Sequence, residues 1–207
     1  MSWPTTITTC LINMGLILGA FSWATDGFAV LTTEEARRRS VAREMPELPS
    51  LKVESLNGTK GDWRQILKSD DRVTIMHFVY TRCRTLCFAQ TAQTLNLQRL
   101  ILEESLAGDI QLATISFDPK NDTFDVLKQY AQRFEVQPEI WSLWRPSNQK
   151  ELGAVLAALG IIVIPDTMGE YVHNAAWLIV DRQARLRAIV PQEHPLRALQ
   201  LAQQMSL

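Results

Sequence analysis

The stretch VTIMHFVY, residues Val73 to Tyr80, decides the fold, because β-branched and aromatic side chains fill most of it. A short run of this kind is typical of a strand that is buried on both faces of a sheet. After Cys83 the apolar residues recur about every 3.6 positions, from Leu86 to Ile101, which predicts a helix. Two cysteines, Cys83 and Cys87, therefore lie where a central strand gives way to a helix.

The patterns on either side of this stretch predict a whole domain. Leu51 to Ser55 alternates in hydropathy and Asn57-Gly58 is a turn signal, so a hairpin opens the domain. The other predicted elements are a helical segment at Trp63 to Leu67, a strand at Gln111 to Phe117, a helix with Phe124 to Phe134 capped by Asp122-Thr123, a helix at Ser147 to Leu159, strands at Ala175 to Val180 and Leu186 to Val190, and a helix at Pro195 to Met205. A strand–helix–strand unit implies a parallel crossover, and the last two strands add an antiparallel edge. The class is α/β: a thioredoxin-like mixed central sheet flanked by helices, with an N-terminal hairpin.

The N-terminus has the composition of a leader. No charged side chain precedes Asp26, and an apolar run extends from Cys10 to Phe21. A run of this length is short for a bilayer, which needs roughly 20 residues, and it suits the apolar part of a secretory signal. The small residues around Ser22 to Ala24 offer a cleavage site, and Ala29 offers a second. If the leader is not cleaved, Ile7 to Trp23 would anchor the protein in the membrane.

The chain is thus divided into three parts by its sequence. Residues 1–29 are the predicted signal peptide or N-terminal anchor, residues 30–50 a linker helix, and residues 51–207 the thioredoxin-like domain. In the linker, Glu34 and Glu35 each stand four residues before an arginine, a spacing that favours a short surface helix. The protein is expected to be exported, either periplasmic or anchored to the inner membrane and facing the periplasm.

Charge excludes one large class of function. Lys plus Arg total 21 and Asp plus Glu total 22, so the formal net charge is −1. Broad binding of nucleic acid needs a concentrated cationic surface, and no nucleic acid partner is expected.

The spacing of the two cysteines limits their chemistry. A helix N-terminus favours thiolate over thiol, and Arg82 and Arg84 act in the same direction. Residues four apart on a helical turn share one face, so both sulfurs can reach one small object or each other. Three residues separate Cys83 from Cys87, whereas a redox-active thioredoxin motif has two. Structural zinc would need a second pair of ligands, and two soft thiolates suit Cu(I).

A third ligand is expected among three histidines. His77 lies in the predicted central strand and is interpreted as a core residue with a hydrogen bond, and His194 is interpreted as solvated. His173 stands just before the strand at Ala175 to Val180, in a predicted loop that faces the cysteine turn in a thioredoxin-like fold. This position makes His173 the candidate.

Three motifs carry a resemblance to a known family. The stretch FVYTRCRTLC, ending at Cys87, resembles the copper-site turn of the SCO/SenC family, the copper chaperones of cytochrome c oxidase assembly. Ile115 to Thr123 (ISFDPKNDT) is similar to a second family motif, and Val172-His173 with Asp181 resembles a third. The motifs occur in the family's order across most of the predicted domain.

The resemblance implies a copper site formed by Cys83, Cys87 and His173. It implies a metallochaperone that passes copper to the dinuclear copper site of an oxidase subunit, its partner, with the membrane a second partner through the N-terminus. No substrate bond is made or broken in that role, so the protein would not be an enzyme. Arg84 and Phe88 depart from the family pattern, which has proline at both positions, and proline would fix the turn.

Other functions stay open at this point. The principal alternative is a thiol–disulfide oxidoreductase in which Cys83 and Cys87 cycle to keep the target's metal-binding cysteines reduced. A peroxidase and a plain structural disulfide are further alternatives. Asp118 matches an acidic family position near the site and also suits a strand-ending turn, while Asp122 is interpreted as a helix cap.

Overall fold

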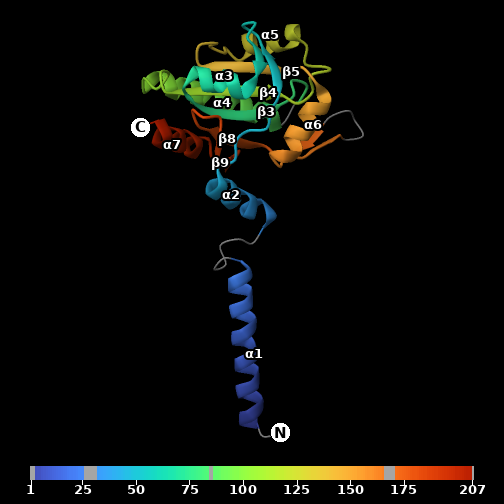
Figure 1. Ribbon diagram of the computed structural model, residues 1–207, viewed down its shortest axis with the longest axis vertical. Coiled ribbons are helices and arrows are strands. Elements are labelled where there is room, and N and C mark those ends of the chain that lie inside the picture. The colour runs from blue at the N-terminus through green and yellow to red at the C-terminus, as the bar shows by residue number, and fades with distance from the viewer. Residues whose placement is uncertain (1–2, 26–31, 84–85, 166–170, 207) are drawn as a thin grey trace. The chain divides into compact units, whose positions relative to one another are not determined.

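The structure is a computed structural model, shown in Figure 1, that describes residues 3–25, 32–83, 86–165 and 171–206. The side chains of residue 5 and of residues 86–88 lie outside that description. The chain divides into two compact units, Met1–Arg43 and Glu44–Leu207.

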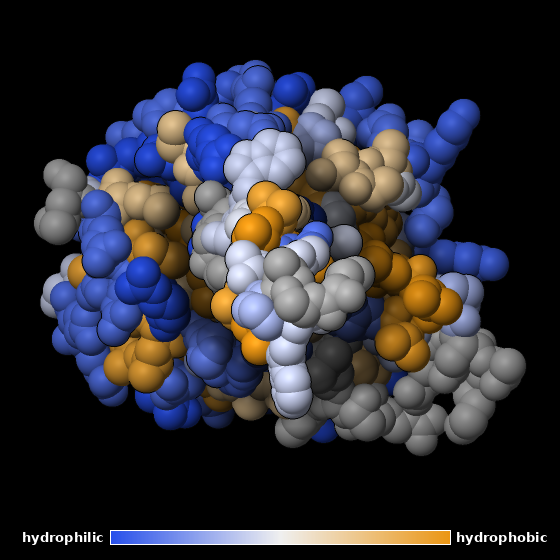
Figure 2. Space-filling view, turned by 90° about the horizontal axis from the view of Figure 1, so that it is seen from below, coloured by the Kyte–Doolittle hydropathy of each residue, from blue (hydrophilic) through white to orange (hydrophobic). Residues whose placement is uncertain are grey.

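The N-terminal unit contains two helices of opposite character. Helix α1, Trp3–Ala24, contains a stretch, Thr6–Ala24, that is long and apolar enough to cross a membrane. Figure 2 views this helix end-on, and the side chains it shows there are mostly pale or orange, the colours of intermediate and apolar residues. Helix α2, Thr33–Glu44, is polar, and Glu34 pairs with Arg38 as the charge pattern predicts, at 3.1 Å. Arg37 joins the same carboxylate at 2.8 Å.

The second unit is built on one large sheet. Seven strands pair in the order β2-β1-β5-β4-β3-β8-β9. The strands of the unit are β1 Lys52–Ser55, β2 Lys60–Asp62, β3 Val73–Val79, β4 Ile110–Ser116, β5 Trp141–Pro146, β6 Val163–Pro165, β7 Tyr171–His173, β8 Ala176–Val180 and β9 Leu186–Pro191. The helices of the unit are α3 Trp63–Asp70, α4 Leu86–Glu103, α5 Phe124–Arg133, α6 Gln149–Ala158 and α7 Pro195–Ser206. Because β3, β4 and β5 are parallel and the other pairs antiparallel, the predicted mixed sheet is confirmed.

The centre of the sheet is buried on both faces, as the sequence predicts. Every residue of β3 and β4 is buried. Val73 and Ile75 of β3 share one core cluster with apolar residues of α4 and α7. Phe78 points to the other face, where its ring meets that of Trp63 from α3 at 6.3 Å. Helices therefore cover both faces of the sheet, and the predicted thioredoxin-like class with an opening hairpin, β1 and β2, is confirmed.

One strand of the sheet is missing from the sequence-based prediction. Strand β5, WSLWRP, pairs in parallel with β4 and antiparallel with β1, so it connects the hairpin to the rest of the sheet. Its sequence contains arginine and proline, and the prediction left it unassigned. Burial of Trp141 and Trp144 between neighbouring elements, rather than a local pattern, makes this segment a strand.

A second correction concerns the surroundings of His173. The prediction placed this residue in a loop, but it is the last residue of β7, which pairs antiparallel with β6 in a separate two-stranded sheet. Successive side chains of a strand point to opposite sides. Ile164 and Val172, which are register partners, are 55% and 65% exposed, whereas His173 is only 7% exposed. This two-stranded sheet, here called the β6–β7 arm, therefore has an outward apolar side and an inward side with His173.

Candidate functional site

The candidate site lies at the carboxyl ends of β3 and β4, the edge where open α/β sheets bind their ligands. Tyr80 follows β3 and is buried, and its carbonyl oxygen accepts a hydrogen bond from the N–H of Cys83 at 3.3 Å. Phe117 follows β4, and its N–H donates to the carbonyl of Val79 at 2.9 Å. The turn that carries Cys83 thus starts from the rigid centre of the sheet.

Asp122 fixes the beginning of that turn. Its carboxylate accepts hydrogen bonds from the Thr81 hydroxyl at 2.6 Å and from the Thr81 N–H at 3.3 Å. The Ser116 hydroxyl donates to it at 2.5 Å. Burial raises the pKa of the Asp122 carboxyl, and the hydrogen bonds from Ser116 and Thr81 offset part of that shift. Of the predicted cap Asp122-Thr123, Thr123 is confirmed, because it caps α5 by accepting from the Val126 N–H. The interpretation of Asp122 as a helix cap is wrong, because its carboxylate bonds Thr81 and Ser116 and so braces the cysteine turn.

A second carboxylate ties down the next residue of the turn. Asp118 is buried and accepts a hydrogen bond from the guanidinium of Arg82 at 3.0 Å. The side-chain amide of Asn121 donates to the same carboxylate at 2.8 and 2.9 Å. Arg82 is itself 53% exposed, so the pair joins the buried strand end to the surface. Both residues that precede Cys83 are therefore anchored to the segment after β4.

Aromatic packing brings the β6–β7 arm to the same edge. The rings of Tyr80 and Tyr171 lie 5.1 Å apart, and the N–H of Tyr171 donates to the Tyr80 hydroxyl at 3.1 Å. Phe117 contacts the ring of Tyr171 at 5.6 Å and that of His173 at 5.0 Å. The imidazole of His173 and the turn of Cys83 thus share one support, formed by Tyr80 and Phe117. Burial lowers the pKa of His173, which favours the neutral imidazole that metals require.

The structure describes the side chains of two of the three predicted ligands. Cys83 is half-buried in the turn, and His173 lies on the arm at the same edge. Cys87 is the second residue of α4, and its side chain lies outside the described set. Among the side chains that are described, no three from His, Cys, Asp and Glu are grouped closely enough to hold a metal ion. The complete set of three ligands remains a prediction.

The other histidines have the positions that the sequence suggests. His77 is fully buried, and its Nε2 lies 2.5 Å from the Thr114 hydroxyl, so its interpretation as a core residue is confirmed. Burial lowers the pKa of His77 to about 3; a hydrogen bond with the Gln90 side chain opposes the shift and the nearby His173 adds to it. His194 is exposed, in agreement with its expected solvation.

Gln90 is a residue of this region that sequence reasoning missed. It is fully buried on α4, three positions after Cys87, and its side-chain nitrogen donates to the Ala176 carbonyl at 3.5 Å. Ala176 in turn stands three positions after His173. The Gln90 side chain therefore connects α4, which carries Cys87, to β8, which follows His173. A polar residue amid the apolar periodicity of α4 is the signal that could have identified it.

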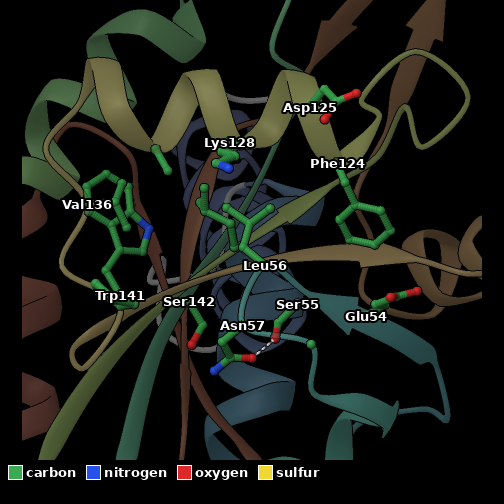
Figure 3. Close-up of a pocket in the computed structure, with 14 residues that line it drawn as sticks. Glu54, Ser55, Leu56, Asn57, Phe124, Asp125, Lys128, Val136, Trp141 and Ser142 are labelled. Carbon is green, nitrogen blue, oxygen red and sulfur yellow. Dashed lines mark hydrogen bonds between the residues drawn. The ribbon is translucent and has the colours of Figure 1, made fainter.

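A cavity with several apolar lining residues lies elsewhere in the second unit. Figure 3 shows it between the end of β1, helix α5 and β5, with a volume of about 510 Å³. Leu56, Phe124 and Trp141 contribute apolar surface, and Lys128 and Asp125 come from α5. None of the described residues that line it is a cysteine or a histidine. The predicted thiol and imidazole ligands are therefore not among the described residues that line this cavity.

The sheet order, the helices on both faces and a cysteine turn after the central strand define a thioredoxin-like protein with a thiol site. Within that class the chain belongs to the SCO1/SenC family, whose model matches residues 55–205. The match covers most of the second unit, and the family predicted from the three motifs is confirmed.

One relative and two solved structures illustrate the similarity. The SCO1 protein homolog of Bacillus subtilis (strain 168) is 26% identical to this chain over 110 residues. The aligned residues are 52% of this chain and 56% of the relative, so the chain spans about half the length of that relative. A structure of BsSco, described as a member of the Sco family of cytochrome c oxidase assembly proteins with a disulfide switch, has a TM-score of 0.67 at 20% identity and covers 78% of this chain and 94% of its own. The copper-bound structure of Arabidopsis thaliana ScoI has a TM-score of 0.62 at 15% identity, covering 75% and 96%.

Proposed function

We propose that this protein is a copper metallochaperone. It binds one copper ion through Cys83, Cys87 and His173 and passes it by ligand exchange to the dinuclear copper site of an oxidase subunit. Copper is cargo in this role, so the protein acts without making or breaking a bond in a substrate.

One observation carries the proposal. The rings of Tyr80 and Phe117 support both the turn that holds Cys83 and the β6–β7 arm that holds His173, although about 90 residues separate the two ligands. The donor set also suits the ion, because thiolate sulfur and neutral imidazole bind Cu(I) well. The copper-bound Arabidopsis relative and the family membership support the same cargo.

The experiment is a competition for Cu(I). The reduced full-length protein in detergent is titrated with Cu(I) against a chelator of known affinity, and tight binding of one ion is expected. Cys83→Ala and His173→Ala should each bind much more weakly, whereas His194→Ala, which removes an exposed histidine, should bind like the wild type. Equally weak binding by the wild type and by Cys83→Ala would contradict the proposal.

A second function has its own support. Arg84 and Phe88 stand where the family pattern has prolines, and a turn without these prolines is less fixed. BsSco is described as having a disulfide switch. The alternative is a thiol–disulfide oxidoreductase that uses Cys83 and Cys87 on the oxidase subunit's cysteines. His173→Ala separates the two roles: copper binding should fall, while the rate of thiol–disulfide exchange should persist.

The same proposal includes a place of action. We infer that the second unit is exported and lies in the periplasm or at the periplasmic face of the inner membrane, with α1 as signal or anchor. The apolar stretch Thr6–Ala24 of α1 supports this. Protease added to spheroplasts should degrade the second unit without lysis. Protection of that unit until the cells are lysed would contradict export.

A further inference from the structure

A hollow beside Cys83 has the composition of a docking site. It has a volume of about 320 Å³ and is lined by the cysteine turn, by α4 and by α5. Cys83 itself lines it, together with two aromatic residues, Tyr130 and Phe134, and two arginines, Arg82 and Arg133. Neither Asp nor Glu occurs among the described residues that line this hollow.

The two arginines come from different elements. Arg82 is hydrogen-bonded to the buried Asp118 at 3.0 Å, so much of its charge is compensated. Arg133 is exposed at the end of α5, and its guanidinium lies 5.5 Å from the centre of the Phe134 ring. The Asp122 carboxylate, the other acid near the turn, is buried and bonded to Thr81 and Ser116. Both arginines therefore place positive charge beside the hollow, and that of Arg133 lies on the α5 side.

We propose that this hollow receives an acidic peptide segment of the protein that exchanges copper with Cys83. The inference rests on the proposed function and deepens it by naming the chemistry of the partner. A carboxylate side chain would meet Arg133, while its aliphatic stem would pack on Tyr130 and Phe134. Charges at a rim steer the approach of a partner and select its sign. A partner segment bound here would have its own cysteine next to Cys83, where ligand exchange takes place.

The experiment measures charge selection at Cys83 without copper. Three peptides are made that differ only in whether Glu, Gln or Lys flanks a cysteine carried as its 2-thiopyridyl disulfide. The Cys83 thiolate attacks the peptide sulfur, the peptide–thiopyridyl S–S bond breaks, and thiopyridone leaves with the electron pair, which gives an optical signal. In the reduced full-length protein the Glu peptide should react fastest and the Lys peptide slowest, and 0.5 M salt should remove the difference.

Variants assign the selection to Arg133. Arg133→Gln should reduce the preference for the Glu peptide over the Lys peptide by about threefold. Arg133→Lys should retain most of it, and Arg99→Gln, which removes an exposed arginine of α4 that does not line the hollow, should leave it unchanged. Equal rates for the three peptides, no reaction at all, or a preference that survives in Arg133→Gln would each overturn the proposal. Because no copper is present, failure here is distinct from failure to bind Cu(I).

Discussion

The carboxylate of Asp122 accepts hydrogen bonds from both the hydroxyl and the N–H of Thr81, a residue 41 positions earlier in the chain. Asp122 thereby joins the segment after β4 to the start of the cysteine turn. The Ser116 hydroxyl completes the set of donors from inside the sheet.

This brace should be costly to remove. In Asp122→Ala the donors of Thr81 and Ser116 would lose their acceptor, and each buried polar group left without a partner costs about 1–3 kcal/mol. We expect the free energy of unfolding, measured with urea, to fall by about 2–4 kcal/mol. Asp125→Ala, a change of the same type at an exposed position in the next turn, should cost less than about 1 kcal/mol. Similar losses in the two variants would show that Asp122 is not a structural brace.

The attachment of the β6–β7 arm should depend on one hydroxyl. In Tyr80→Phe the N–H of Tyr171 loses its acceptor while the ring contact is kept. A hydrogen bond is worth about 1 kcal/mol net, so amide hydrogen exchange at Tyr171 should become about fivefold faster. Tyr130→Phe removes a hydroxyl that bonds Thr91 instead, and exchange at Tyr171 should not change. Equal exchange in wild type and Tyr80→Phe would mean that this bond does not hold the arm.

Gln90 and Gln98 provide a matched pair on α4. Both glutamines are buried, but Gln90 bonds Ala176 near His173, whereas Gln98 bonds the backbone at Glu135 and Gln137. If the proposed site is correct, Gln90→Leu should weaken Cu(I) binding by about tenfold, because groups that orient metal ligands have effects of this size. Gln98→Leu should change stability and leave affinity intact.

A double variant tests whether Gln90 affects Cu(I) binding through His173. In His173→Ala, adding Gln90→Leu should cause no further loss of Cu(I) affinity, since the ligand that Gln90 positions is already gone. If Gln90→Leu lowers Cu(I) affinity in this variant as much as it does in the wild type, Gln90 acts on a group other than His173.

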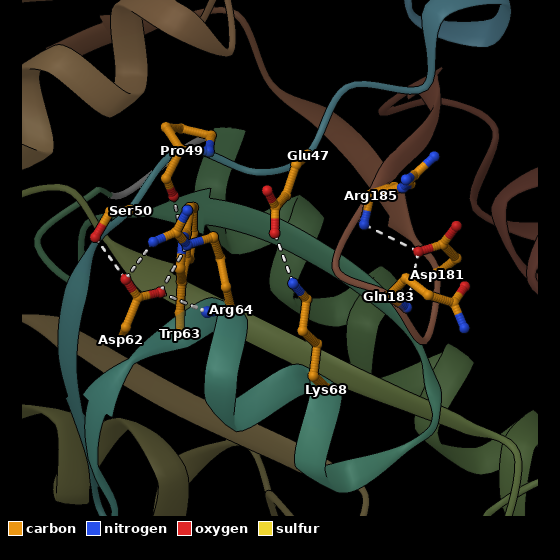
Figure 4. A network of polar contacts seen from close by, with 10 residues as sticks. All are labelled: Glu47, Pro49, Ser50, Asp62, Trp63, Arg64, Lys68, Asp181, Gln183 and Arg185. Atoms are coloured by element: carbon orange, nitrogen blue, oxygen red, sulfur yellow. Dashed lines mark hydrogen bonds and ion pairs between the residues drawn. The ribbon is translucent and has the colours of Figure 1, made fainter.

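Acid stability should depend on a surface network that Figure 4 shows beside α3. Asp62 caps α3 at the Arg64 N–H and pairs with the guanidinium of Arg64 at 2.9 Å, and Ser50 donates to it at 2.5 Å. Burial alone would raise the pKa of Asp62, but these hydrogen bonds outweigh it and lower the pKa from 3.8 to about 2. A lowered folded-state pKa adds stability above the unfolded-state value, and that stability is lost as the pH falls through about 2.

The corresponding variant is Asp62→Asn. Asparagine can still cap α3, but it loses the ion pair with Arg64, so at pH 6 the variant should be up to about 1 kcal/mol less stable than the wild type. The difference should shrink as the pH falls from 4 toward 2, because the wild-type carboxylate then becomes protonated. Urea unfolding at several pH values measures it, and Asp125→Asn is the control. A difference that does not change over this range would contradict the assignment.

The elements that the sequence predicts best are those with a complete local pattern. β3 and β4 are continuous buried runs, and apolar residues recur along α4 with the period of a helix. The residues of these three elements therefore specify their own secondary structure. β5 is different: its six residues become a strand because β4 and β1 pair with it on either side. A sequence read locally contains no sign of those two partners.

The residues of the candidate site also divide into those that a local sequence pattern identifies and those that only the folded chain brings together. Cys83 and Cys87 are recognised by their spacing, and His173 by its place before a strand. The bond between Tyr80 and Tyr171 spans 91 positions, and that between Thr81 and Asp122 spans 41, so neither is visible in a local pattern. Asp122 stands just before a helix, where an aspartate ordinarily caps, and only the folded chain shows that it bonds Thr81 instead.

In the described part of the β6–β7 arm three residues pair with three, Val163 with His173 at one end and Pro165 with Tyr171 at the other. Side chains alternate along a strand, so sliding β7 by one position would turn the isopropyl group of Val172 toward Phe117 and the imidazole toward water. Inserting or deleting one amino acid within β7 would therefore convert a histidine-bearing edge into an aliphatic one while leaving both cysteines untouched.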